Sequence, residues 1–371
     1  MSGARHLYIH LPFCAHRCGY CDFVTAVDRR KQHGGYVDAL LAELGLERDA
    51  LAPRPETIFL GGGTPTFTEP AALERLLEGL PDADEVTVEA NPETVTPPLA
   101  RLLSRNRVNR ASLGAQSFQP RLLSVLERRA QPDDVRRAVY VLRDAGFDNI
   151  SLYLLYGIPG QTTSDLDSDL DDALALEPEH VSCYELEAKL GTRFTHAHGD
   201  ELERQAESME SYFERVVATL TGAGYRWYET ANFCRGEESR DLRARHNLGY
   251  WLGQDYLGLG VGAVSTIQTV RRRNAPRLRS YLAALARGEE PPREFEPLDA
   301  HTRRRERIML GLRLDEPLPF GGLENAVDRE ALARLERLGL VARNGVNGHE
   351  TLALTERGRF LGGGVTAELL A

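Results

Sequence analysis

The sequence predicts an α/β fold: an open, partial (β/α)6 barrel followed by a small α+β, winged-helix-like C-terminal domain. Three observations predict it. Short β-rich segments alternate with longer segments of helical period, which is the pattern of a parallel sheet. About six such strands precede residue 201, fewer than the eight of a closed barrel. Beyond residue 299, two helical segments lead into two short strands.

Length and charge bound the possible classes of protein. The 371 residues, 42% of them hydrophobic, can bury one large core and a smaller one. The net charge of −10 provides no basic field for phosphates, so nucleic acid is not expected as a partner. The N-terminus lacks the features of a secretory signal, and no apolar run approaches the roughly 20 residues of a membrane-spanning helix. We expect a cytoplasmic protein.

The domain boundaries follow from the order of these segments. We expect the partial barrel over residues 1–230 and the C-terminal domain over residues 299–371. Between them, residues 231–298 form an extension that carries the segment HNLGYW and a proline-containing linker at residues 291–297. A long amphipathic helix is expected at residues 201–221.

The six strands are expected at residues 6–10, 57–60, 85–90, 110–114, 149–155 and 181–186. In a β/α barrel, the loops after the carboxyl ends of the strands form the binding face. Here those loops hold the conspicuous residues of the chain, at 14–21, 61–64, 89–92, 116–118 and 157–160. The sequence therefore predicts that its chemistry gathers on one face.

A cysteine loop of the form C-x-x-x-C-x-x-C follows the first strand directly and contains Cys14, Cys18 and Cys21. Thiolates suit zinc or iron-sulfur clusters. Zinc sites usually pair one C-x-x-C with a second pair well downstream, which this chain lacks, so a cluster is favoured over structural zinc. Three cysteines leave one iron of a four-iron cluster open. The two other cysteines, Cys183 and Cys234, stand alone in apolar runs and are expected in the core.

With Tyr20 before its last cysteine, the loop resembles that of the radical S-adenosylmethionine (SAM) superfamily. There the open iron holds the methionine part of SAM, and the reduced cluster cleaves SAM to a 5′-deoxyadenosyl radical. The run GGGTPT at residues 61–66 is similar to the loop that binds the methionine amine in this superfamily, because glycine lets a ligand approach the backbone closely. By itself this run could be a plain turn.

The resemblance narrows to the oxygen-independent coproporphyrinogen III oxidase-like family over about residues 6–360. The segments that carry it are LYIHLPFCAHRCGYCDF, FLGGGTPT, VTVEANPE, NRASLGAQSF, YGIPGQT, HNLGYW and YLGLGVGA. It implies a 4Fe-4S cluster on the three cysteines. The positions that it implies for SAM binding are Tyr8, Tyr20, Gly62, Gly63, Thr64, Glu89, Gln116 and Arg128. From the residue types alone, the last three could equally be solvated or paired in salt bridges.

In three features the chain resembles the heme chaperone branch of that family rather than the true oxidases. The oxidases carry a further cysteine two residues after the third, where this chain has Phe23, and they have an N-terminal extension before the cluster strand. HNLGYW also matches the H-N-x-x-Y-W motif of the chaperone branch, which implies that His246 binds heme. A neutral imidazole is a good axial ligand. The alternative is that His246 hydrogen-bonds inside an aromatic core.

The resemblance implies a heme chaperone that binds heme and SAM and delivers heme to membrane cytochromes, with a flavodoxin- or ferredoxin-type reductant. Two alternatives stay open: an oxidase that decarboxylates coproporphyrinogen III, which the missing fourth cysteine disfavours, and a radical methyl- or methylene-transferring enzyme. Tyr153 stands where the family usually has an aspartate. Loss of that carboxylate would weaken contacts to the SAM ribose, so SAM cleavage is less expected than cluster binding.

Overall fold

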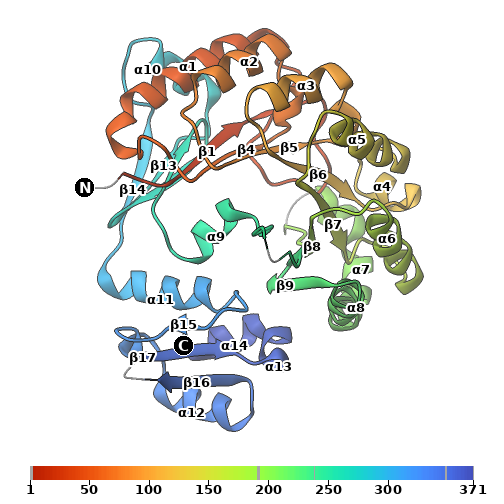
Figure 1. The fold of residues 1–371 in the computed structure, drawn as a ribbon, viewed down its shortest axis with the longest axis vertical. Helices are drawn as coiled ribbons and strands as arrows, with labels where there is room; N and C mark the ends of the chain where they lie inside the picture. Colours follow the sequence, from red (N-terminus) through yellow and green to blue (C-terminus); the bar gives the residue numbers. More distant parts are fainter. Residues whose placement is uncertain (1–2, 190–192, 238, 347–348, 371) are drawn as a thin grey trace.

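The frame of the molecule is one twelve-stranded sheet, seen in a computed structural model that describes residues 3–189, 193–237, 239–346 and 349–370. The strand order is β14-β13-β12-β11-β1-β4-β5-β6-β7-β8-β10-β9, so within the described ranges β14 and β9 are the edges (Figure 1). The sheet is open, as the sequence predicted.

The six predicted strands form the parallel centre of this sheet. They are β1 (His6–Leu11), β4 (Thr57–Gly62), β5 (Glu85–Ala90), β6 (Arg110–Gln116), β7 (Ile150–Tyr156) and β8 (His180–Glu185). Their side chains are buried on both faces, because helices and loops cover a parallel sheet on both sides. The expected (β/α)6 core is confirmed.

Helices between these strands cover one face of the sheet, as Figure 1 shows. They are α1 (His33–Leu46), α2 (Pro70–Gly79), α3 (Pro97–Arg105), α4 (Pro120–Val125), α5 (Pro132–Asp144) and α6 (Thr163–Ala175). Four of them begin with proline, whose fixed φ and missing N–H suit the first helical position. Leucines one turn apart, such as Leu73 and Leu76 of α2, bury one face, and each contributes roughly 1.5–3 kcal/mol.

The helix expected at residues 201–221 is instead two helices, α7 (Arg193–Gln205) and α8 (Met209–Gly222), with a 3-10 turn at Ala206–Ser208. The break is held by contacts with a distant loop. The side chains of Gln205 and Tyr212 both donate hydrogen bonds to the carbonyl of Gln161, at 3.0 and 2.8 Å. Amphipathic period alone could not show this tertiary contact.

Residues 225–297 extend the same sheet at both ends. The added elements are β9 (Tyr225–Glu229), β10 (Asn232–Arg235), α9 (Arg245–Trp251), β11 (Tyr256–Leu259), β12 (Val264–Ile267), β13 (Val270–Asn274), α10 (Leu278–Leu285) and β14 (Arg293–Pro297). The linker expected at residues 291–297 is therefore wrong for Arg293–Pro297, which pairs antiparallel with β13. Proline is tolerated there because an edge strand has a neighbour on one side only.

The C-terminal region has its own apolar core around Phe320 and Leu335 and is the small α+β domain that the sequence predicted. Its elements are α11 (Ala300–Gly311), β15 (Leu318–Pro319), α12 (Arg329–Arg337), β16 (Val341–Val346), β17 (His349–Leu354), α13 (Glu356–Phe360) and α14 (Gly362–Leu369). In the parts of the chain that the structure describes, no helix has both the length and the apolar character needed to cross a bilayer.

Candidate functional site

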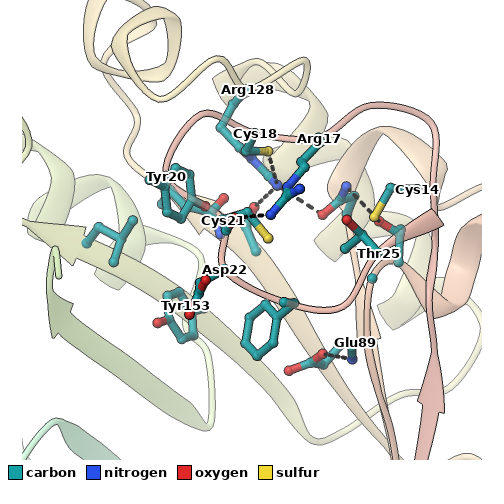
Figure 2. Close-up of a pocket in the computed structure, with 18 of the residues that line it drawn as sticks. Cys14, Arg17, Cys18, Tyr20, Cys21, Asp22, Thr25, Glu89, Arg128 and Tyr153 are labelled. Atoms are coloured by element: carbon teal, nitrogen blue, oxygen red, sulfur yellow. Dashed lines mark hydrogen bonds between the residues drawn. The ribbon is translucent and has the colours of Figure 1, made fainter. Parts of the chain in front are cut away.

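The cysteine loop is closed at its base by a short strand pair. β2 (Phe13–Cys14) and β3 (Ala26–Val27) pair in parallel, and the amide of Ala26 donates to the carbonyl of Pro12 at 2.7 Å. Inside the loop, the amide of Cys21 donates to the carbonyl of Cys18 at 3.2 Å. The loop therefore holds its three cysteines at the carboxyl end of β1, facing one cavity (Figure 2).

A chain of hydrogen bonds connects two of these cysteines through three other segments. The Thr64 hydroxyl donates to Cys14 Sγ at 3.5 Å and accepts from Asn91 Nδ2 at 3.2 Å. Arg128 Nη2 donates to Asn91 Oδ1 at 3.0 Å, and Arg128 Nη1 donates to Cys18 Sγ at 3.7 Å. Figure 2 shows the contact between Arg128 and Cys18. Sulfurs that accept hydrogen bonds are better able to carry negative charge.

The glycines at the end of β4 stand where an added side chain would collide with neighbouring residues. Gly62 has φ +110°, and a Cβ there would lie 2.6 Å from the His10 ring. A Cβ on Gly63 would lie 2.6 Å from the Pro12 carbonyl and 3.0 Å from Cys14 Sγ. Glycine is therefore required at Gly63 by the backbone of the cysteine loop, and the exposed backbone of this run can approach a ligand closely.

Two polar side chains face the cavity from the ends of β5 and β6. Glu89 accepts a hydrogen bond from the Gly62 amide at 3.1 Å, and burial raises its pKa from 4.5 to about 7. Gln116 is 6% exposed, its Oε1 has no hydrogen-bond partner among the described residues, and its φ is +60°. A strained non-glycine backbone beside an unpaired buried oxygen is typical of a ligand site.

Aromatic side chains line another wall of the cavity. Tyr153 stacks on Tyr184 with ring centroids 5.0 Å apart, and Tyr20 packs edge-on against Phe194. Tyr153 thus fills with an apolar ring the position where the resembled family has a carboxylate. This wall suits a flat aromatic group better than a ribose hydroxyl.

The cavity has a volume of about 460 Å³, within the roughly 300–1,000 Å³ usual for ligand pockets. It brings together ten of the residues expected in the site: Cys14, Cys18, Cys21, Tyr20, Gly62, Gly63, Thr64, Glu89, Gln116 and Arg128. No three described His, Cys, Asp or Glu side chains converge as they would on a single metal ion. In a cluster each cysteine binds a separate iron, so three thiols that line one cavity suit such a group.

Two expected residues lie elsewhere. Tyr8 packs on Phe59 and lines a second cavity. His246, in α9, is 1% exposed; its Nδ1 lies 2.7 Å from Thr57 Oγ1 and its Nε2 lies 2.8 Å from the Tyr250 hydroxyl. An axial ligand needs a free ring nitrogen that faces the iron, so in this structure His246 has the position of a hydrogen-bonded core histidine, the alternative that the sequence left open.

The site also contains residues to which the sequence reasoning assigned no role. Asn91 joins Thr64 to Arg128, and Arg17 donates to the carbonyl of Cys21 at 3.2 Å inside the loop. Asn91 lies two residues after Glu89 in the VTVEANPE segment, so its place at a strand end was a usable signal. Nothing in the pattern around Arg17 distinguishes it from a solvated arginine. Cys183 and Cys234 are buried outside the cavity, as expected.

Comparison with protein families finds two matching regions. Residues 8–173 match the Radical SAM superfamily, and residues 298–361 match the HemN C-terminal domain. The first region contains the whole cysteine loop and strands β4 to β7.

Curated relatives match along nearly the full chain. The heme chaperone HemW of Mycobacterium tuberculosis (strain CDC 1551 / Oshkosh) is 36% identical over 380 residues, covering 98% of this chain and 94% of that protein. The heme chaperone HemW of Bacillus subtilis (strain 168) is 31% identical over 385 residues, covering 98% of each. Among solved structures, the coproporphyrinogen III oxidase HemN of Escherichia coli superposes with a TM-score of 0.82 at 23% identity, covering 100% of this chain and 91% of that one.

Proposed function

Because this chain belongs to the heme chaperone HemW family of radical SAM proteins, we propose that it binds a 4Fe-4S cluster, SAM and heme, and transfers the heme to another protein. The observation that carries the proposal is the likeness to curated heme chaperones along 98% of the chain. Membrane cytochromes are the recipients we propose, and a flavodoxin- or ferredoxin-type protein is the proposed reductant.

The cluster would be held by Cys14, Cys18 and Cys21. Burial raises the pKa of the Cys14 thiol to about 11, so iron binding there must displace a proton. The hydrogen bonds that Thr64 and Arg128 donate to sulfur would stabilise the resulting thiolates. These hydrogen bonds support the proposal that the cysteines bind iron as thiolates.

SAM would lie beside the open iron, against Gly62, Gly63, Glu89 and Gln116. Gly62 and Gly63 line the cavity without side chains, the Glu89 carboxylate can accept from ribose hydroxyls, and Gln116 Oε1 is an acceptor that no described residue pairs. When bound, the cluster and SAM would supply one-electron chemistry at the sulfonium. Since Tyr153 replaces a carboxylate in this wall, we propose that SAM binding serves the chaperone role more than SAM turnover does.

We propose that this occurs in the cytoplasm. All five cysteines are unpaired, three of them in the loop that would bind iron. Free thiols and an iron-sulfur cluster both persist in a reducing compartment.

The test uses the full chain, reconstituted anaerobically with iron and sulfide. Hemin should shift its Soret band on binding, and the protein should hold about four iron atoms per chain. Cys14→Ser should abolish the cluster, whereas Cys234→Ser, which changes a buried cysteine outside the cavity, should retain it. A wild-type spectrum that hemin leaves unchanged would contradict the chaperone role. Anaerobic conversion of coproporphyrinogen III to protoporphyrinogen would identify an oxidase. Formation of a methylated acceptor would identify a methyl-transferring enzyme.

A further inference from the structure

A second, larger cavity lies between the antiparallel extension of the sheet and the first helix of the C-terminal domain. Its volume is about 950 Å³, near the upper end of the roughly 300–1,000 Å³ usual for ligand pockets. One wall is formed by β12 and β13, and the opposite wall by α11. Figure 1 shows α9 above α11 in this part of the molecule. The cavity can therefore hold a ligand larger than the cysteine cavity can.

The side chains that line this cavity carry a net positive charge, whereas the whole chain carries a net negative charge. Five arginines and three carboxylates line it, although the whole chain carries a net charge of −10. Arg271 Nη2 forms an ion pair with Glu306 Oε2 at 2.7 Å, and this ion pair joins β13 to α11. Arg303 and Arg307 form no ion pair within the described ranges, and they lie one turn apart on the same face of α11. Arg307 Nη1 donates to the carbonyl oxygen of Trp251 at 3.3 Å, but no described carboxylate neutralises either guanidinium group, so the two arginines suit two neighbouring carboxylates.

Buried donors in the same lining also lack acceptors. The Nε1 of Trp251 and the Nε of Arg304 are shielded from solvent and have no hydrogen-bond partner among the described residues. Both atoms can only donate, so the complementary ligand carries acceptor oxygens.

Aromatic side chains also line this cavity. Tyr250, Trp251 and Tyr256 present aromatic rings. Phe23, which is 63% exposed, and Met309, which is 46% exposed, also line the cavity. A ligand with a broad apolar face and two acidic groups at one edge matches this distribution.

We propose that this cavity is the cargo site, and that it binds a planar tetrapyrrole dicarboxylate with its carboxylates at Arg303 and Arg307 and its ring against Tyr250 and Trp251. The inference rests on the proposed chaperone function and specifies where the cargo lies. Asp22 and Phe23, which follow Cys21, line both cavities, so cargo here would lie next to the cysteine loop. That shared wall offers a direct route by which cluster or SAM binding can influence the cargo.

The test compares a diacid with its diester. Heme and metal-free protoporphyrin IX carry two propionates, and their dimethyl esters keep the ring but lose both charges. The double variant Arg303→Gln/Arg307→Gln, in anaerobically reconstituted full-length protein, should bind the diacids about tenfold more weakly and the diesters with little change. The variant Arg303→Lys/Arg307→Lys, which keeps both charges, should retain most of the affinity. Cluster absorbance and the thermal midpoint report that the variants are folded.

The matched control is Arg101→Gln/Arg279→Gln, which removes two exposed positive charges from α3 and α10, outside the cavity lining. It should bind heme as the wild type does. If wild-type protein binds heme but the Arg303/Arg307 variant binds it equally well, or loses diacid and diester alike, the cargo site is overturned while the chaperone function stands. If the wild type binds neither porphyrin, both proposals fail.

Discussion

The Nε2 atom of His246 lies 2.8 Å from the hydroxyl oxygen of Tyr250, and the ring of Tyr250 lines the larger cavity. The other ring nitrogen of His246 is held by Thr57 at 2.7 Å. Burial lowers the pKa of His246 well below its usual value, so the ring is neutral. We therefore propose that His246 is a positioning residue, which orients the tyrosine that lines the proposed cargo site.

We expect His246→Ala to destabilise the protein by about 2–3 kcal/mol, because it removes a buried ring and leaves the Tyr250 hydroxyl without this partner, while Thr57 keeps its contact with His6 at 2.8 Å. Heme affinity should fall, while the Soret position of the heme that still binds should match the wild type, since no iron ligand is lost. Denaturant unfolding and heme titration measure the two effects. Tyr250→Phe, which removes only the hydroxyl, should reproduce part of the stability loss. A changed Soret position in His246→Ala alone would show that the histidine ligates iron.

The pH dependence of SAM binding should follow Glu89. Its raised pKa, about 7, means that the carboxyl is mostly protonated at about pH 6 and mostly ionised at about pH 8. Because ribose hydroxyls donate to the ionised form, SAM affinity should rise by about tenfold over that interval. Titration calorimetry measures the affinity and the released proton. Glu89→Gln should bind SAM more weakly, with no such rise; a rise that survives in this variant assigns the titration to another group.

The same raised pKa has a consequence for stability. Unfolded Glu89 ionises near 4.5, whereas the folded group holds its proton to about 7. The folded state therefore binds more protons between these values, and its free energy of unfolding should fall as pH rises through this window. Glu89→Gln should remove this part of the decline. Urea unfolding of wild type and variant at several pH values measures the difference.

Arg128 should set the reduction potential of the proposed cluster. Its Nη1 donates to Cys18 Sγ, and hydrogen bonds to sulfur favour the reduced, more negative cluster. Arg128→Met should lower the midpoint potential by about 60 mV, or about 1.4 kcal/mol for one electron, the energy of one such bond. A potentiometric titration followed by electron paramagnetic resonance measures it. Arg101→Met is the control, and an equal potential in both variants would contradict the role of Arg128.

Gly63→Ala should prevent cluster assembly. The new Cβ would lie 2.6 Å from the backbone of Pro12 and 3.0 Å from Cys14 Sγ, so the cysteine loop would have to move. Iron content after reconstitution measures the loss. Gly45→Ala in α1 is the matched control, since nothing lies within 4 Å of its added methyl group, and it should raise the free energy of unfolding by about 0.5–1 kcal/mol. Full iron content in Gly63→Ala would show that the loop can adapt.

The sequence could predict the (β/α)6 core and ten of the residues in the cysteine cavity, because both depend on local order. A strand followed by a loop repeats at each step, and parallel strands carry their end loops to one edge of the sheet. The place of Asn91 followed from the same rule. The local pattern gave a wrong prediction at residues 291–297. The prolines there indicated a linker, but Arg293–Pro297 forms a strand that pairs with β13.

The sequence by itself therefore determined the cysteine spacing, the six central strands and the family of the protein. Only the tertiary structure decided that His246 is buried and that the arginines of α11 face a cavity. Both depend on contacts between segments far apart in the chain: Thr57 and His246 are 189 positions apart, and Arg271 and Glu306 are 35 apart. The first contact depends on the packing of α9 against β4 and the second on the packing of α11 against β13, and no local periodicity encodes either.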